Sequence, residues 1–158
     1  MDKIMRIGGK YVNGNTETVK GILVDTDGVL QITRNNKIDQ VIILNEVSHS
    51  STTTLSFYGN NAIDLDGWTT CWIVAENHLD VDVTIRLFSQ LDKTSSRYLR
   101  NIDNETIIIP IRHNPSGQII ITPEDYPVLN YLRYFSGGVY FDTAPTQGTL
   151  SLSLFRKR

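Results

Sequence analysis

The sequence predicts an all-β protein: an antiparallel, jelly-roll-like β-sandwich preceded by an extended N-terminal arm with a hairpin. Apolar and polar residues alternate with a period of two in several short segments, which is typical of strands with one buried face. Ile, Val, Leu, Thr and Tyr are common while Ala is scarce, a composition that suits pleated sheets. Turn-forming residues recur every ~8–12 residues, the spacing found in sandwiches and barrels.

The first part of the chain is predicted to be an arm. Residues 1–20 are rich in Gly, Asn and Thr and are expected to form an irregular lead-in. Residues 21–32 place two short apolar segments on either side of Asp27-Gly28, a dipeptide that strongly favours a hairpin turn. The sequence therefore predicts a hairpin over 21–32.

A domain boundary is expected after the next apolar segment. Residues 38–47 form that segment, and the polar, low-complexity stretch 47–54 follows it. We therefore assign residues 1–47 to the arm and hairpin and residues 48–158 to the sandwich. The 158-residue length suits one domain with a short appendage.

Strands are predicted throughout the second part. The expected segments are 55–59, 62–67, 69–76, 81–88, 105–113, 118–122, 129–135, 137–143 and 148–158.

Three of these segments carry further structural information. Residues 69–76 and 81–88 alternate strongly and are predicted to pair antiparallel through the turn at 76–80, with Val81, Val83, Ile85 and Leu87 facing inward. Pro110 cannot donate to a central ladder, so its segment is expected at a sheet edge or bulge. One short helical turn is possible in 91–101 and another in 123–132.

The last segment alternates leucines at 150, 152 and 154 with small hydroxyl side chains at 149, 151 and 153. Successive side chains of a strand point to opposite faces. The leucines are therefore expected to face the core and the hydroxyls to form an outer wall. Arg156, Lys157 and Arg158 are expected to be a solvated tail that guards a sheet edge, with contact to an acidic neighbour left open.

Charge and composition exclude several classes of function. Lys and Arg total 15 and Asp and Glu total 17, which gives a formal net charge of −2. This balance does not favour nucleic-acid binding, which needs a concentrated basic surface. The longest apolar segments, such as 41–44, are far too short to span a membrane. No nucleic-acid or membrane partner is therefore predicted.

No motif indicates catalysis, a metal or a cofactor, so the prediction is a non-enzymatic protein without cofactors. The D-x-D-G sequences at 25–28 and 64–67 lack the spacing of an EF-type calcium loop and are interpreted as tight turns. A different calcium site involving Asp80 or Asp82 stays open. The three histidines lie far apart in the sequence, and the single cysteine, Cys71, lies within a strand and is expected to be buried.

Two segments together resemble a known class of protein. Residues 67–88, GWTTCWIVAENHLDVDVTIRLF, and residues 131–158, YLRYFSGGVYFDTAPTQGTLSLSLFRKR, resemble β-sandwich domains of tailed-bacteriophage virion proteins. This class includes capsid decoration (cement) proteins and some tail and fibre components. The opening GILVDTDGVLQI at 21–32 resembles the openings of such proteins.

The resemblance implies a structural protein of the virion, made in the host cytoplasm, that stabilises the capsid shell by subunit contacts. It implies a homotrimer and a partner that is the major capsid protein or another virion protein. The arm would make these contacts, since it has too few apolar residues for a core of its own. The expected interface residues are Gly21, Ile22, Leu23, Val24, Val29, Leu30 and Ile32.

The alternative is a carbohydrate-binding or receptor-binding sandwich module of a tail or fibre. Aromatic side chains can stack on sugars or fill interfaces. Trp68 and Tyr134 are the residues predicted to stack on such a ligand.

Overall fold

The computed structural model describes residues 6–7, 10–13, 16–19, 22–24, 30–31 and 37–158. The chain divides into two compact units, residues 1–35 and 36–158.

The N-terminal unit contains short antiparallel strands. Its strands are β1 (Arg6–Ile7), β2 (Lys10–Asn13), β3 (Thr16–Val19), β4 (Ile22–Val24) and β5 (Leu30–Gln31). Strands β2 and β3 pair with each other, and β4 lies between β1 and β5.

Strands β4 and β5 lie within the segment 21–32, for which a hairpin is predicted, and pair antiparallel. Its turn residues, Asp27 and Gly28, lie outside the described residues. The prediction of an irregular lead-in over 1–20 was wrong, because β1, β2 and β3 are strands. Polar residues such as Thr16 and Thr18 suit a strand even where no apolar alternation marks it.

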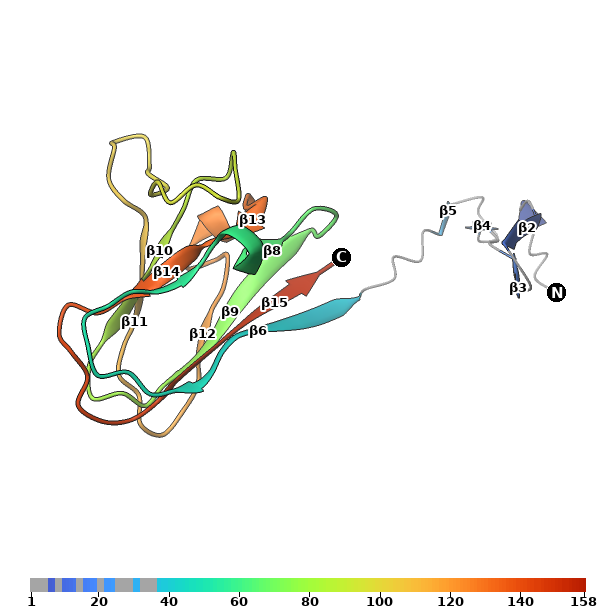
Figure 1. The fold of residues 1–158 in the computed structure, drawn as a ribbon. Helices are drawn as coiled ribbons and strands as arrows, with labels where there is room; N and C mark the ends of the chain where they lie inside the picture. Colours follow the sequence, from blue (N-terminus) through green and yellow to red (C-terminus); the bar gives the residue numbers. More distant parts are fainter. Residues whose placement is uncertain (1–5, 8–9, 14–15, 20–21, 25–29, 32–36) are drawn as a thin grey trace. The chain divides into compact units, whose positions relative to one another are not determined.

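The second unit contains two four-stranded antiparallel sheets, which confirms the predicted β-sandwich (Figure 1). One sheet has the order β12-β9-β15-β6 and is called the β15 sheet; the other has the order β11-β10-β14-β7 and is called the β10 sheet. The strands are β6 (Ile38–Val47), β7 (Leu55–Phe57), β9 (Thr70–Asn77), β10 (Val83–Leu87), β11 (Ile108–Ile111), β12 (Ile119–Ile121), β14 (Gly137–Tyr140) and β15 (Leu150–Lys157).

Smaller elements lie beside the two sheets. Strands β8 (Ile63–Asp64) and β13 (Tyr134–Phe135) pair with each other. Two short 3-10 helices, η1 (Gly59–Asn61) and η2 (Pro127–Asn130), complete the described elements.

Alternation along the strands builds the core. The three leucines of β15, at 150, 152 and 154, are all 0% exposed, and Ser151 and Ser153 between them lie on the outer face. Val83, Ile85 and Leu87 of β10 are buried in the same way. Burying one such side chain contributes about 2 kcal/mol. The predicted inward faces of these two strands are therefore confirmed.

The predicted pairing of residues 69–76 with 81–88 was wrong. Strand β9 pairs with β12 and β15, whereas β10 pairs with β11 and β14 in the other sheet. The turn between them is fixed by the buried side chain of Asn77. Its Nδ2 donates to the carbonyls of Val81 (3.0 Å) and Ile111 (3.2 Å), and its Oδ1 accepts from the N–H of Leu79 (3.2 Å). The chain thus crosses from one sheet to the other at this turn.

The division of the chain also differs from the predicted boundary after residue 47. Strand β6, assigned to the arm in the sequence prediction, pairs with β15 from Ile38 to Val47 and belongs to the sandwich. The second compact unit accordingly begins at residue 36. The backbone pairing of β6 with β15 joins residues 38–47 to the sandwich, so the polar stretch 47–54 is a loop within this unit and does not mark a domain boundary.

The remaining local predictions have mixed outcomes. Pro110 lies in β11 at an edge of the described β10 sheet, as predicted. The helical turn expected within 123–132 is η2, but the strand expected from 129 begins only at Tyr134. Pro127 opens η2 and explains this late start, since proline is favoured at the first helical position. Among the described residues, 91–101 contain turns and no helix.

We expect Gly148→Ala to destabilise the protein by about 3 kcal/mol or more. Gly148 has φ +93°, and a Cβ there would lie 2.0 Å from the carbonyl oxygen of His78. Gly117→Ala is the matched control, because the nearest atom to its Cβ would be the side-chain Nδ2 of Asn114 at 3.2 Å. Urea unfolding of both variants measures the difference, and equal stabilities would contradict this account of the turn.

Candidate functional site

The single cysteine is a core residue, as predicted. Cys71 is 1% exposed, and its Sγ donates to the carbonyl of Leu129 at 3.2 Å. Burial raises the pKa of this thiol to about 12. At neutral pH the group is a neutral thiol, which is a poor nucleophile.

The acidic turn residues bond to the protein's own donors. Asp64 accepts from the N–H of Asp66 at 2.8 Å in a turn where Gly67 has φ +76°, which confirms the predicted tight turn at 64–67. Asp80 accepts from the hydroxyl and the N–H of Thr146, and these bonds lower the pKa of its carboxyl. The first D-x-D-G sequence, at 25–28, lies outside the described residues.

The described residues contain no group of three or more His, Cys, Asp or Glu side chains placed to hold a metal ion. Asp82 accepts from the N–H of His113 at 2.7 Å, and His49 lies against the ring of Phe141 at 4.4 Å. These contacts fix loops at the ends of the sandwich. In the part of the chain that is described, no helix is long and apolar enough to span a membrane.

The two aromatic residues predicted to stack on a ligand, Trp68 and Tyr134, lie beside arginines. The guanidinium groups of Arg156 and Arg158 lie 4.3 and 4.4 Å from the centre of the Trp68 ring. That of Arg133 lies 5.2 Å from the centre of the Tyr134 ring. These cations occupy ring surface that a sugar would otherwise use.

The predicted arm residues lie in the N-terminal unit. Ile22, Leu23 and Val24 form β4, and Leu30 begins β5. Gly21, Val29 and Ile32 lie outside the described residues.

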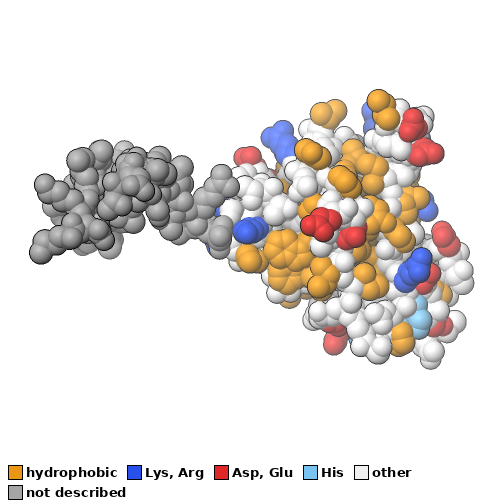
Figure 2. Space-filling view, turned by 180° about the vertical axis from the view of Figure 1, so that it is seen from behind, with side chains coloured by type: hydrophobic (Ala, Val, Ile, Leu, Met, Phe, Trp, Pro, Cys, Tyr) orange, Lys and Arg blue, Asp and Glu red, His pale blue; other side chains and the backbone are white. Residues whose placement is uncertain are grey.

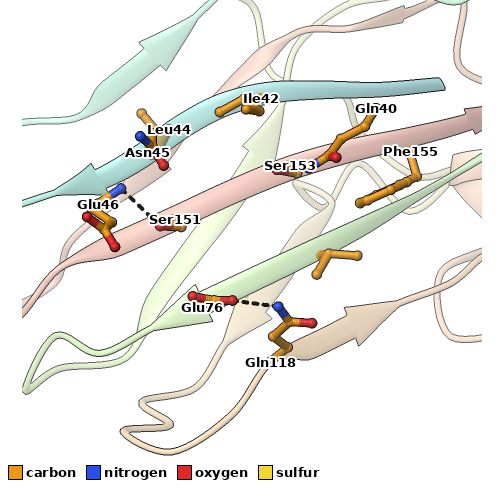
Figure 3. A pocket seen from close by; sticks show the side chains of 11 residues that line it. Gln40, Ile42, Leu44, Asn45, Glu46, Glu76, Gln118, Ser151, Ser153 and Phe155 are labelled. Carbon is orange, nitrogen blue, oxygen red and sulfur yellow. Dashed lines mark hydrogen bonds between the residues drawn. The ribbon is translucent and has the colours of Figure 1, made fainter.

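A groove of about 300 Å³ lies on the outer face of the β15 sheet (Figure 3). All four strands, or the residues next to them, contribute to it. Its lining residues are Gln40, Ile42, Leu44, Asn45 and Glu46 from β6, Val74 and Glu76 from β9, Gln118 before β12, and Ser151, Ser153 and Phe155 from β15.

Irregular pairing between β6 and β15 gives the groove its shape. The two-residue step from Leu150 to Leu152 on β15 lies opposite a three-residue step on β6, from Val47 to Leu44. The single-residue step from Leu152 to Ser153 lies opposite a two-residue step on β6, from Leu44 to Ile42. Extra residues of this kind are β-bulges, which bend a strand and increase its twist. Glu46 lies in this irregular region with φ 48°. The small side chains of Ser151 and Ser153 leave the floor of the groove low between the longer side chains around it.

Hydrogen bonds hold the lining side chains in place (Figure 3). The N–H of Glu46 donates to Ser151 Oγ at 2.9 Å, and Gln40 Nε2 donates to Ser153 Oγ at 3.2 Å. Gln118 Nε2 donates to Glu76 Oε1 at 2.5 Å. Several polar side chains that line the groove are therefore held in fixed positions by hydrogen bonds.

An aromatic pair adjoins this polar surface. Phe155 lines the groove and lies directly across the sheet from Trp72 on β9. Their rings are stacked, with centroids 5.6 Å apart and planes 11° from parallel. Cross-strand aromatic pairs of this kind orient each other.

Sequence reasoning did not find this groove. The outward hydroxyls of the last strand were predicted, and they form its floor. The wall formed by β6 was missed because residues 38–47 were assigned to the arm. Trp72 and Phe155 occupy outward positions of their strands, and the alternation of these strands could have indicated an aromatic pair on the outer wall.

An ion pair links the two strands that form this wall and floor. Arg156 and Asp39 are directly opposed, and both Nε (2.9 Å) and Nη2 (2.7 Å) of Arg156 donate to Asp39 Oδ2. Arg156 thus lies in an inner strand of the sheet, whereas the sequence predicted a solvated tail that guards an edge; its bond to Asp39 is the acidic contact that the prediction had left open.

Comparison with protein-family models, with curated proteins and with solved structures returned no match for this chain.

We expect Asp39→Asn to lower stability at pH 7 and to have no effect at strongly acidic pH. The hydrogen bonds and charge of Arg156 lower the pKa of Asp39. The stability that its carboxylate contributes is therefore complete above the unfolded-state pKa of about 3.9, and it is lost as the pH falls through the lower folded-state pKa. Urea unfolding between pH 7 and pH 2 measures this.

The control is Asp103→Asn, which removes the same charge from an exposed loop. A destabilisation by Asp39→Asn that stays constant over this pH range would contradict the role of the ion pair.

Proposed function

We propose that this protein is a non-enzymatic structural protein of a phage virion, and that it decorates or cements the capsid shell. The sandwich would be its body, and the N-terminal unit would carry the contacts to the shell. The observation that carries the proposal is the nested pairing of the sandwich strands.

The nested pairing supports a jelly roll. Strand β6 pairs with β15, β7 with β14, β9 with β12, and β10 with β11, so the strands of the first half meet those of the second half in reverse order. This is a long two-stranded ribbon folded on itself. The pairs β9–β15 and β10–β14 then join the ribbon into two sheets. Jelly rolls of eight strands occur in viral capsid and lectin domains and in cupins.

The packed core of the sandwich supports a structural role that depends on surface contacts and not on catalysis. The space between the sheets is filled by side chains such as Ile73, Ile85, Ile109 and Leu152, all 0% exposed. The centre of the sandwich therefore offers no space for a ligand, which leaves the outer walls, the edges, the loops and the N-terminal unit. One face of the sandwich shows separate hydrophobic groups with acidic and basic side chains between them (Figure 2).

The division of the chain supports a role for the N-terminal unit in attachment. It is a separate compact unit of short strands. Strands with few neighbours are marginally stable alone and gain by pairing or packing with a partner. In an array, many such weak contacts act together. The resemblance of residues 67–88 and 131–158 to virion proteins points to the capsid shell as the partner and to a trimer as the assembled form.

Light scattering on the full chain is expected to give three times the 17.9 kDa chain mass. Leu23→Asp places a charge in β4, the middle strand of its sheet, and is expected to reduce the mass to that of one chain. It is also expected to abolish co-sedimentation with capsids of the phage that encodes the protein.

The control is Leu91→Asp, the same change at a residue that is 91% exposed in the sandwich unit; it is expected to leave both properties intact. A wild-type protein that is monomeric and does not sediment with capsids would rule out the proposal.

A further inference from the structure

The groove on the outer face of the β15 sheet has the chemistry of a sugar site. We propose that it binds a neutral saccharide, with the Phe155 ring against one face of a sugar and the polar side chains around its hydroxyls. This site is separate from the predicted pair Trp68 and Tyr134. The sugar site and the virion role are independent proposals, because a protein that binds the shell but has no affinity for sugars would leave the virion role intact.

The polar lining matches the needs of hydroxyl groups. Each sugar hydroxyl both donates and accepts hydrogen bonds. The amides of Gln40, Asn45 and Gln118 also offer both functions, and the carboxylates of Glu46 and Glu76 accept. Gln118 holds one oxygen of Glu76 at 2.5 Å, which orients that carboxylate before any ligand binds. Such preorganisation reduces the entropy cost of binding.

The apolar part of the groove suits the C–H face of a sugar ring. Phe155 is half-buried and is held by stacking on Trp72. Because the face of an aromatic ring is electron-rich, it attracts the weakly positive C–H groups of a sugar. Ile42 on the neighbouring strand β6 is 62% exposed and adds a second apolar surface to the groove.

Charge selects the class of sugar. Among the described residues, those lining the groove include Glu46 and Glu76 but no Lys, Arg or His. An anionic ligand such as a phosphate or an acidic sugar would meet two carboxylates without a compensating cation. A volume of about 300 Å³ lies at the lower end of the range for ligand sites. These features favour a neutral sugar.

A second copy of the chain fits this surface poorly. In a twofold contact the same patch faces itself. Two concave patches would leave a void between them, which forfeits packing contacts. The same contact would also bring the carboxylates of two copies together. The exposed Ile42, which lines the groove, is better explained as part of a ligand site.

The test begins with the fluorescently labelled full-length protein on an array of neutral and acidic oligosaccharides. The strongest neutral oligosaccharide is then titrated while backbone amide signals are followed by NMR. We expect binding to neutral sugars alone, with shifts centred on Ser151, Ser153 and Gln118.

Two variants locate the site. Ser153→Tyr fills the floor from an outward position and is expected to abolish binding. Glu76→Gln keeps the shape but removes a charged acceptor, and is expected to weaken binding about tenfold or more. The matched controls are Ser96→Tyr and Glu124→Gln, the same changes at exposed residues outside the groove lining. Both controls are expected to bind as the wild type does, and thermal unfolding checks that all four variants are folded.

Several results would overturn the proposal. These are an array without any neutral ligand, binding to acidic sugars alone, shifts centred on Trp68 and Tyr134, or unchanged binding by folded Ser153→Tyr. A change in solution mass caused by Ser153→Tyr would instead assign the groove to contacts between copies.

Discussion

The pairing of the last strand, β15, with both β9 and β6 is the constraint on which the sandwich depends. It places the leucines at 150, 152 and 154 in the core and the serines between them on the outer wall. It also joins residues that are far apart in the sequence: Gln40 and Ser153, which share a hydrogen bond, are 113 residues apart. The β15 sheet therefore cannot be completed until the end of the chain has joined it, and such non-local pairing slows folding.

Strand periodicity predicted which residues face the core but not which strands are neighbours. Val83, Ile85 and Leu87 were placed correctly, because alternation alone determines the buried face. The pairing of 69–76 with 81–88 was wrong, because an alternating segment pairs equally well with several others. The crossing between the sheets is held by Asn77 at the end of β9, whose buried amide bonds to the carbonyls of Val81, after the crossing, and of Ile111 in the β10 sheet. An asparagine in a turn has no sequence feature that reveals this role.

In the candidate site, too, local sequence predicted some features, whereas those that depend on which strands are neighbours were missed. The aspartates of turns behave as turn chemistry predicts: Asp92 and Asp125 accept from threonine donors two or three residues away, which lower the pKa of each carboxyl. Glu46 and Glu76 instead lie on the outer wall of a sheet. Their proximity depends on the bulges of β6 and on the position of β15 between β6 and β9, and neither follows from local sequence. The groove is thus a product of topology.

Backbone NOE measurements on the full-length protein test the strand order most directly. The account predicts contacts between β15 and β9 at the opposed pairs Ser153–Val74 and Leu154–Ile73, and between β15 and β6 at Leu154–Val41. A ladder of contacts joining β9 to β10 across the turn at 78–82, with none between β9 and β15, would contradict it.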